Sequence, residues 1–120
     1  MKYTRIYSDK EGVTHFEDKD EKMNLKVFAP PSPEFQVSDF KKSKHFCIAN
    51  VPAGWDGGWH PTPYKQYCFF LVGAMEVRTG DGEYRIFGPG SIVYLEDTNG
   101  NGHFSKIVSH EDAVIIAVQV

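Results

Sequence analysis

Apolar residues alternate with polar ones over short runs along most of the chain, a period of two that is typical of strands with one buried face. The runs are rich in β-branched and aromatic residues and predict eight strands. They cover residues 3–7, 44–51, 66–72, 75–79, 83–87, 91–95, 103–108 and 113–120. No long window keeps the apolar spacing of an amphipathic helix. The pattern therefore predicts an all-β sandwich or closed barrel.

Turn-forming residues divide these runs. Gly80-Asp81-Gly82 predicts a hairpin turn, because glycine adopts positive φ without strain. The proline-rich stretch 30–33 cannot be a central strand, since proline lacks the ladder donor. We expect residues 11–40 to form an arm of short edge strands and extended segments around the barrel, with the charged run 17–22 as a solvated turn.

Length and composition indicate one domain, with an N-terminal arm and edge strands over 1–43 and a motif-bearing barrel over 44–120. A net charge of −3 with interspersed signs leaves no basic surface for nucleic acid. No apolar run has the length of a membrane span or of a secretory signal, so we expect a cytoplasmic protein with no membrane partner. Cys47 and Cys68 lie in apolar strands and are expected to be free and buried.

Candidate chemistry gathers where alternation places polar side chains on one strand face. Residues two apart point to the same side of a strand, so three short sets can each line the barrel. These sets are His60 with Thr62, Gln66 with Cys68 and Phe70, and His103 with Ser105 and Ile107. Two imidazoles and one carboxamide oxygen could bind a divalent ion. The same side chains could instead anchor an organic ligand without metal.

Spacing in this region matches a known motif in part. His60 follows Gly54 after five residues, Gln66 comes six residues after His60, and Gly73 closes the frame. The chain here resembles the first motif of the cupin superfamily, with Thr62 in place of the second histidine and Gln66 in place of glutamate.

A second stretch resembles the other cupin motif. His103 stands three residues after Gly100, and Thr98 takes the place of a proline. The resemblance covers roughly residues 44 to 120. The residues around both motifs are similar to those of a group of small single-domain RmlC-like cupins. This resemblance implies a double-stranded β-helix, that is, a cupin jelly-roll barrel with an N-terminal arm.

The resemblance implies a site inside the barrel. His60, Gln66 and His103 would hold Fe, Mn, Ni or Zn, and the protein would be a metal-dependent enzyme of dioxygenase or isomerase type acting on a small molecule. The alternative is a metal-free small-molecule binding protein with a degenerate site. The expected pocket residues are Trp59, Thr62, Tyr64, Cys68 and Phe70.

Two further features have a functional and a structural interpretation. Glu96, followed by Asp97, is a candidate general base at the mouth of the barrel, or simply ends a strand. Trp55, Trp59 and Tyr64 could recognise a ligand or pack the mouth loop.

Open sheet edges predict an assembly. Exposed edge strands are usually paired or covered, and the strand-like residues 3–7 suit that purpose. Similar cupins pair through their outer sheets, so we expect a symmetric homodimer with residues 1–10 ordered. In the competing interpretation the arm folds back on its own barrel and the protein is a monomer.

Overall fold

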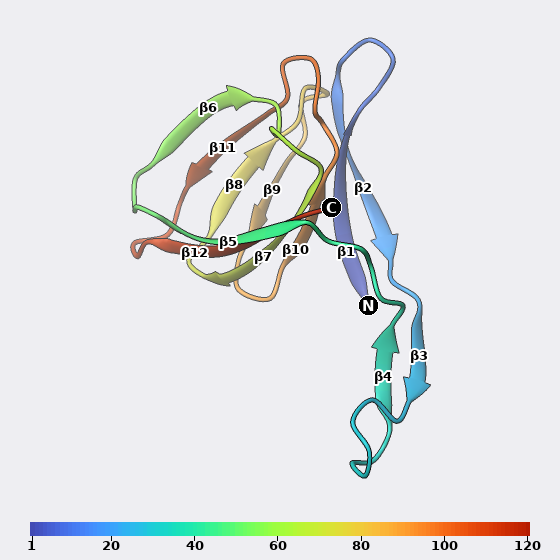
Figure 1. Ribbon diagram of the computed structural model, residues 1–120. Coiled ribbons are helices and arrows are strands. Elements are labelled where there is room, and N and C mark those ends of the chain that lie inside the picture. Colours follow the sequence, from blue (N-terminus) through green and yellow to red (C-terminus); the bar gives the residue numbers. More distant parts are fainter.

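The computed structural model describes residues 1–120 and contains twelve strands and no helix (Figure 1). No element is therefore a helix long and apolar enough to cross a membrane. The strands are β1 (Lys2–Ser8), β2 (Thr14–Asp20), β3 (Met23–Lys26), β4 (Phe35–Ser38), β5 (His45–Val51), β6 (Asp56–His60), β7 (Gln66–Val72), β8 (Met75–Arg78), β9 (Tyr84–Phe87), β10 (Ile92–Leu95), β11 (His103–Ile107) and β12 (Ala113–Gln119).

Strands β5 to β12 form a jelly roll. One sheet has the order β5-β12-β7-β10, and it is opposed by a sheet of order β6-β11-β8-β9. The chain changes sheet at every connection except the β8–β9 hairpin. This is the eight-stranded architecture that cupins share with capsid and lectin domains. The predicted all-β double-stranded β-helix is confirmed by the strand order itself.

The N-terminal residues extend one of the two sheets. β1 pairs with β10 in parallel and β2 pairs with β1, giving the order β2-β1-β10-β7-β12-β5. Residues 2–8 are thus ordered, and they lie on their own barrel. The expectation of a solvated turn over 17–22 was wrong, because residues 17–20 belong to β2. An edge strand with one exposed side tolerates such charges.

The core lies between the two sheets. Alternation is clearest on β11, where His103, Ser105 and Ile107 are buried and the residues between them are half-buried. The buried apolar residues are Ile6, Phe70, Val77, Phe87, Val93, Ile107, Ala113 and Ile115. Both sheets contribute, so the interior is packed rather than open at its centre.

Cysteine placement differs between the two positions. Cys68 is half-buried and Cys47 is exposed, and neither forms a disulfide. The expected burial of Cys47 was wrong because β5 is the edge strand of its sheet and has only β12 beside it.

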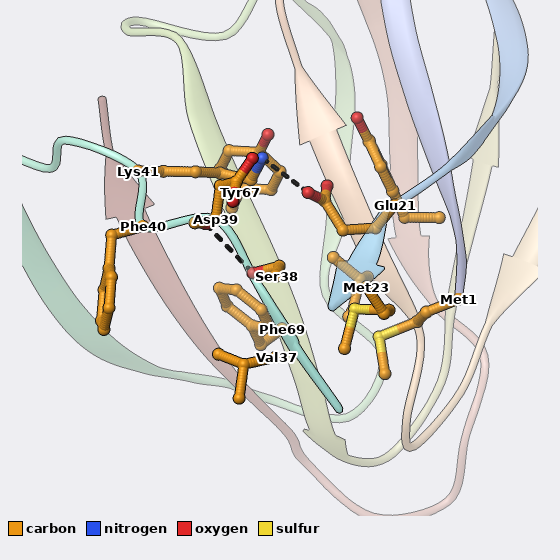
Figure 2. Close-up of a pocket in the computed structure, with 12 residues that line it drawn as sticks. Met1, Glu21, Met23, Val37, Ser38, Asp39, Phe40, Lys41, Tyr67 and Phe69 are labelled. Carbon is orange, nitrogen blue, oxygen red and sulfur yellow. Dashed lines mark hydrogen bonds and ion pairs between the residues drawn. The ribbon is translucent and has the colours of Figure 1, made fainter. Parts of the chain in front are cut away.

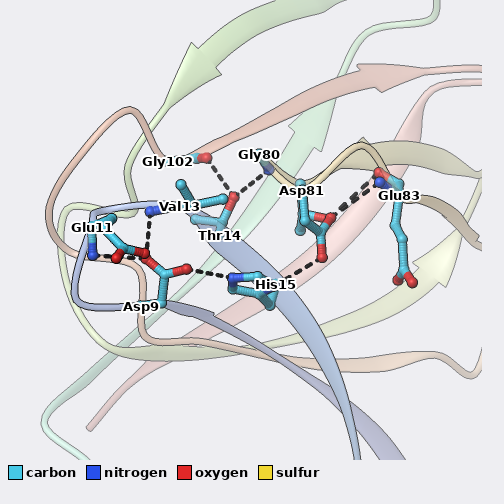
Figure 3. Close-up of polar contacts among 10 residues, drawn as sticks. Asp9, Glu11, Val13, Thr14, His15, Gly80, Asp81, Glu83 and Gly102 are labelled. Atoms are coloured by element: carbon cyan, nitrogen blue, oxygen red, sulfur yellow. Dashed lines mark hydrogen bonds and ion pairs between the residues drawn. The ribbon is translucent and has the colours of Figure 1, made fainter.

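A histidine joins the β1–β2 turn to the β8–β9 turn (Figure 3). His15 Nε2 lies 2.7 Å from Asp9 Oδ2, and its Nδ1 lies 3.0 Å from Asp81 Oδ2. Carboxylates accept, so both ring nitrogens donate when the imidazole is protonated. The hydrogen bond to Asp9, followed by that to Asp81, raises the pKa of His15. The same bond, with that from the backbone N–H of Val13, lowers the pKa of Asp9.

This contact predicts a pH-dependent contribution to stability. A raised histidine pKa stabilises the fold fully below the unfolded value of 6.5 and loses that effect as the pH rises through the folded pKa. The lowered pKa of Asp9 stabilises above its unfolded value of 3.8. We expect His15→Gln to lower the melting temperature most near about pH 5.5 and much less near about pH 8.5.

Thermal unfolding followed by circular dichroism at both pH values measures this difference. His110→Gln is the matched control, because His110 is exposed. An equal loss for His15→Gln at both pH values would contradict the prediction.

Candidate functional site

The two motif histidines are cross-strand neighbours. His60 ends β6, His103 begins β11, and the two residues pair directly in the antiparallel register. Directly opposed residues project on the same face of a sheet with their Cβ atoms close together. Their ring centroids are 4.7 Å apart. The sequence placed these residues at one site, and the geometry brings them together there.

Both imidazoles are held through Nδ1. His60 Nδ1 lies 3.1 Å from the carbonyl oxygen of Gly58, which can only accept. His103 Nδ1 lies 2.6 Å from Asp97 Oδ2. Each ring therefore donates through Nδ1, and in the neutral form its Nε2 has a free lone pair. This is the tautomer in which a histidine binds a metal or accepts a proton through Nε2.

Asp97 is the acidic residue of the site. Its side chain is fully buried, and Oδ1 has no hydrogen-bond partner. Its backbone carbonyl accepts from the N–H of Thr62 at 3.1 Å, so Asp97 is fixed from both ends. A buried carboxylate that is hydrogen-bonded to an imidazole orients the ring and fixes its tautomer.

Gln66 is attached to the same network through Thr62. The Thr62 hydroxyl donates to the carbonyl of Tyr64 at 2.8 Å, and Gln66 Nε2 donates to that hydroxyl at 3.2 Å. These two hydrogen bonds orient the carboxamide of Gln66, because its Nε2 is the atom that donates to Thr62. Gln66 Oε1 remains available as an acceptor or ligand.

Of the other expected pocket residues, some lie inside the barrel and some on its surface. Thr62 and Phe70 are buried, and Cys68 is half-buried on the inner face of β7. Burial raises the pKa of the Cys68 thiol to about 12, so this cysteine is a neutral, unreactive side chain. Trp59 is 52 % exposed and Tyr64 is 59 % exposed.

Trp59 lies on the opposite side of its strand from His60. It packs against Phe104 with ring centroids 6.0 Å apart, on the outer face of the four-stranded sheet. Trp55 is instead the aromatic neighbour of His60, with ring centroids 6.5 Å apart in an edge-on arrangement. The aromatic contact to the site therefore comes from Trp55.

Glu96 and Asp97 project in opposite directions. Glu96 Oε1 accepts from Arg5 Nε at 2.6 Å, and Oε2 lies 3.7 Å from Lys65 Nζ. These contacts hold the candidate general base in an ion pair with β1, whereas its neighbour contacts His103. The strand register explains why Asp97 and not Glu96 faces the site. Leu95 lies opposite the inward-facing Gln66, so alternation turns residue 96 outward and residue 97 inward.

The N-terminal hairpin supports the loop that carries these groups. The backbone N–H of Glu96 donates to the carbonyl of Ile6 at 2.8 Å, and the buried Thr14 hydroxyl donates to the carbonyl of Gly102 at 2.8 Å. Thr14 Oγ1 also accepts from the N–H of Gly80 at 2.7 Å. Strands β1 and β2 thereby fix the segment between Asp97 and His103.

The donor set fits a divalent ion. It comprises two imidazole nitrogens and a carboxamide oxygen, with a buried carboxylate one hydrogen bond away to offset positive charge. No group of three or more His, Cys, Asp or Glu side chains gathers in the structure, so the third ligand would have to be the amide.

Comparisons with known proteins add little to this site. No protein-family model matches the sequence, and the curated proteins contain no match either. Among solved structures, one similar to this chain is a crystal structure assigned to ethanolamine utilization protein Q of Salmonella typhimurium LT2. Identity is 13 %, coverage is 99 % of this chain and 94 % of that one, and the TM-score is 0.37. At that TM-score the likeness supports no conclusion, and the fold rests on the strand order described above.

Proposed function

We propose that this protein is a small cupin whose barrel site binds a divalent metal through His60, His103 and Gln66 and acts on a small molecule. The observation that carries the proposal is the pair of Nδ1 hydrogen bonds, to Gly58 and to Asp97. They leave both Nε2 atoms free at neighbouring positions, as metal ligation requires. A bound Fe, Mn, Ni or Zn ion would supply Lewis acidity or an oxygen-binding centre.

The protein's own residues provide orientation and exclusion of water. Asp97 accepts the hydrogen bond from His103 Nδ1, so the neutral ring has its lone pair on Nε2. Thr62 directs the carboxamide oxygen of Gln66. Phe70 and Ile107 are 4 % and 5 % exposed and form an apolar boundary behind the polar groups. A low-polarity boundary strengthens the electrostatic interactions of whatever ligand binds.

Metal content of tag-free protein tests this proposal. We expect a stoichiometric transition metal after expression with metal supplementation, and its loss from His60→Ala and His103→Ala. Mass spectrometry of the metal provides the measurement. His45→Ala is the matched control, because His45 is exposed on β5. Substoichiometric metal in the wild type would contradict the proposal.

Gln66→Glu is the companion variant. A carboxylate binds a divalent ion more tightly than a carboxamide, because its charge offsets that of the ion. We expect higher metal affinity by isothermal titration. Unchanged affinity would count against coordination at this position.

The alternative is a metal-free binding protein, and the Asp97–His103 pair supports it. A buried carboxylate bonded to an imidazole can hydrogen-bond an organic ligand or move a proton without an ion. Metal-free wild-type protein that is stabilised by small molecules in a thermal-shift screen, with the effect lost in His103→Ala, would favour this function.

A further inference from the structure

The outer surfaces of the two sheets differ in chemistry. Residues 37–41 and the six-stranded sheet enclose a groove of about 330 Å³, and apolar side chains such as Met23, Val37 and Phe69 dominate its lining (Figure 2). The ion pair at its edge, Lys41 Nζ to Glu21 Oε1 at 2.9 Å, is internal to the chain. The four-stranded sheet instead turns both aromatic and charged side chains outward, a combination that can orient a ligand as well as bury it.

A row of four side chains crosses the outer face of the four-stranded sheet. Trp59 on β6 lies opposite Phe104 on β11. Phe104 also lies opposite Arg78 on β8, which in turn lies opposite Tyr84 on β9. Directly opposed residues project on the same face of a sheet. Neighbouring strands are about 4.8 Å apart, so the row extends about 14 Å and forms a strip of three aromatic rings and one guanidinium.

Arg78 is fixed in the middle of this strip. Its guanidinium carbon lies 4.9 Å from the centroid of the Phe104 ring, and its Nε donates to Glu76 Oε2 at 2.8 Å. The remaining N–H groups of Arg78 and Oε1 of Glu76 have no hydrogen-bond partner in the protein. The pair therefore offers a ligand both donors and an acceptor, in an orientation that is set before the ligand binds.

Two hollows adjoin Trp59. The first, of about 500 Å³, lies between Trp59 and Tyr84, and Glu76 and Arg78 contribute to its wall. The second, of about 610 Å³, is lined by Trp59 and by the glycines of three loops. The β8–β9 turn borders both hollows, through residues 79 and 82 in the first and residue 80 in the second. Each has the volume of an ordinary small-molecule site, and Trp59 stands where they meet.

The second hollow offers uncharged hydrogen-bonding groups. Figure 3 shows Val13, Gly80 and Gly102 of its lining gathered around Thr14. At its rim the side chain of Asn101 and the backbone N–H groups of residues 100 and 101 make no hydrogen bond within the protein. An amide side chain both donates and accepts. This hollow is therefore polar without being charged.

The charges of this face do not suit an anionic ligand. Arg78 and Lys106 stand against Asp56, Glu76 and Glu83, so acidic groups slightly outnumber basic ones. A phosphate backbone would need a basic excess. A neutral sugar chain fits better, because its apolar C–H faces can cover aromatic rings while its hydroxyl groups both donate and accept hydrogen bonds.

We propose that the outer face of the four-stranded sheet binds a neutral oligosaccharide, with Trp59 as the aromatic platform between two sugar-binding hollows. One sugar unit lies between Trp59 and Tyr84 and is hydrogen-bonded by Arg78 and Glu76. The next lies over the glycine-lined hollow, where Asn101 is the side chain that contacts it. Trp59 points away from His60 on the same strand, so this site lies outside the barrel and does not depend on a metal.

Isothermal titration with a panel of neutral hexasaccharides of glucose, mannose, galactose, xylose and N-acetylglucosamine tests the proposal. We expect at least one of them to bind with a dissociation constant below about 1 mM. Trp59→Ala should weaken that binding at least about tenfold, the usual effect of truncating a central aromatic anchor, and Trp59→Phe should weaken it less. Tyr84→Ala should also weaken it. Phe46→Ala is the matched control, because Phe46 is 71 % exposed on the six-stranded sheet, and its affinity should be unchanged.

Circular dichroism verifies that each variant is folded, and Tyr84→Ala provides the test if Trp59→Ala is not. Absence of binding by every member of the panel would overturn the proposal, as would wild-type affinity in both aromatic variants. Binding that survives Trp59→Ala but is lost in His103→Ala would place the sugar inside the barrel and would also overturn it. Removal of metal with EDTA should leave the sugar affinity unchanged, so this proposal and the metal proposal fail independently.

Discussion

Replacing Gly102 with alanine is expected to lower the free energy of unfolding by about 2 to 5 kcal/mol, the sum of a left-handed backbone penalty and overpacking. Gly102 has a φ of 72°, in the region that disfavours side chains. An added Cβ would collide with the backbone of His60 and Pro61. Backbone atoms cannot move aside without separating β6 from the loop, so His60 and His103 should lose their pairing as well.

Urea denaturation followed by tryptophan fluorescence measures this loss. Gly82→Ala is the matched control. Gly82 has a φ of 92°, but an added Cβ would meet nothing within 4 Å. It should therefore cost only the backbone penalty, about 1 to 2 kcal/mol. Equal losses for the two variants would show that the close approach to His60 carries no energetic weight.

Asp97→Asn is expected to weaken metal binding by roughly 10- to 100-fold, the usual effect of removing a carboxylate that orients a ligating histidine. The amide keeps the shape of the carboxyl group and removes its charge. Its nitrogen would also lie buried at the position of Oδ1, which has no partner. An unsatisfied buried donor costs about 1 to 3 kcal/mol, so the melting temperature should fall too.

Isothermal titration with Zn²⁺ or Mn²⁺ measures the affinity. Glu96→Gln is the matched control, because this neighbouring carboxylate faces outward to Arg5. It should leave the affinity unchanged. If both variants bind metal as the wild type does, Asp97 has no role in ligation.

Most of the strands could be predicted because their inner and outer residues differ in polarity. The pattern failed at β2, whose charged residues 17–20 resemble a turn although they pair with β1. It also missed β6, where Gly57 and Gly58 weaken the strand signal. In both strands tertiary pairing outweighs local propensity.

The sequence indicated where the candidate site lies, but it did not indicate which acidic residue faces it. Strand alternation and the resemblance to the two cupin motifs together placed His60, Gln66 and His103 at one end of the barrel. The choice between Glu96 and Asp97 depends on the register of β10 against β7, which decides the direction of each side chain.

The N-terminal hairpin contacts the loop before His103. Residues far from the two motifs in sequence should therefore be sensitive to mutation. Thr14 lies 88 residues before Gly102, yet the two share a buried hydrogen bond. A saturation-mutagenesis survey that selects for ligand binding should therefore rank Thr14 among the sensitive positions. A survey confined to the two motifs would overlook it.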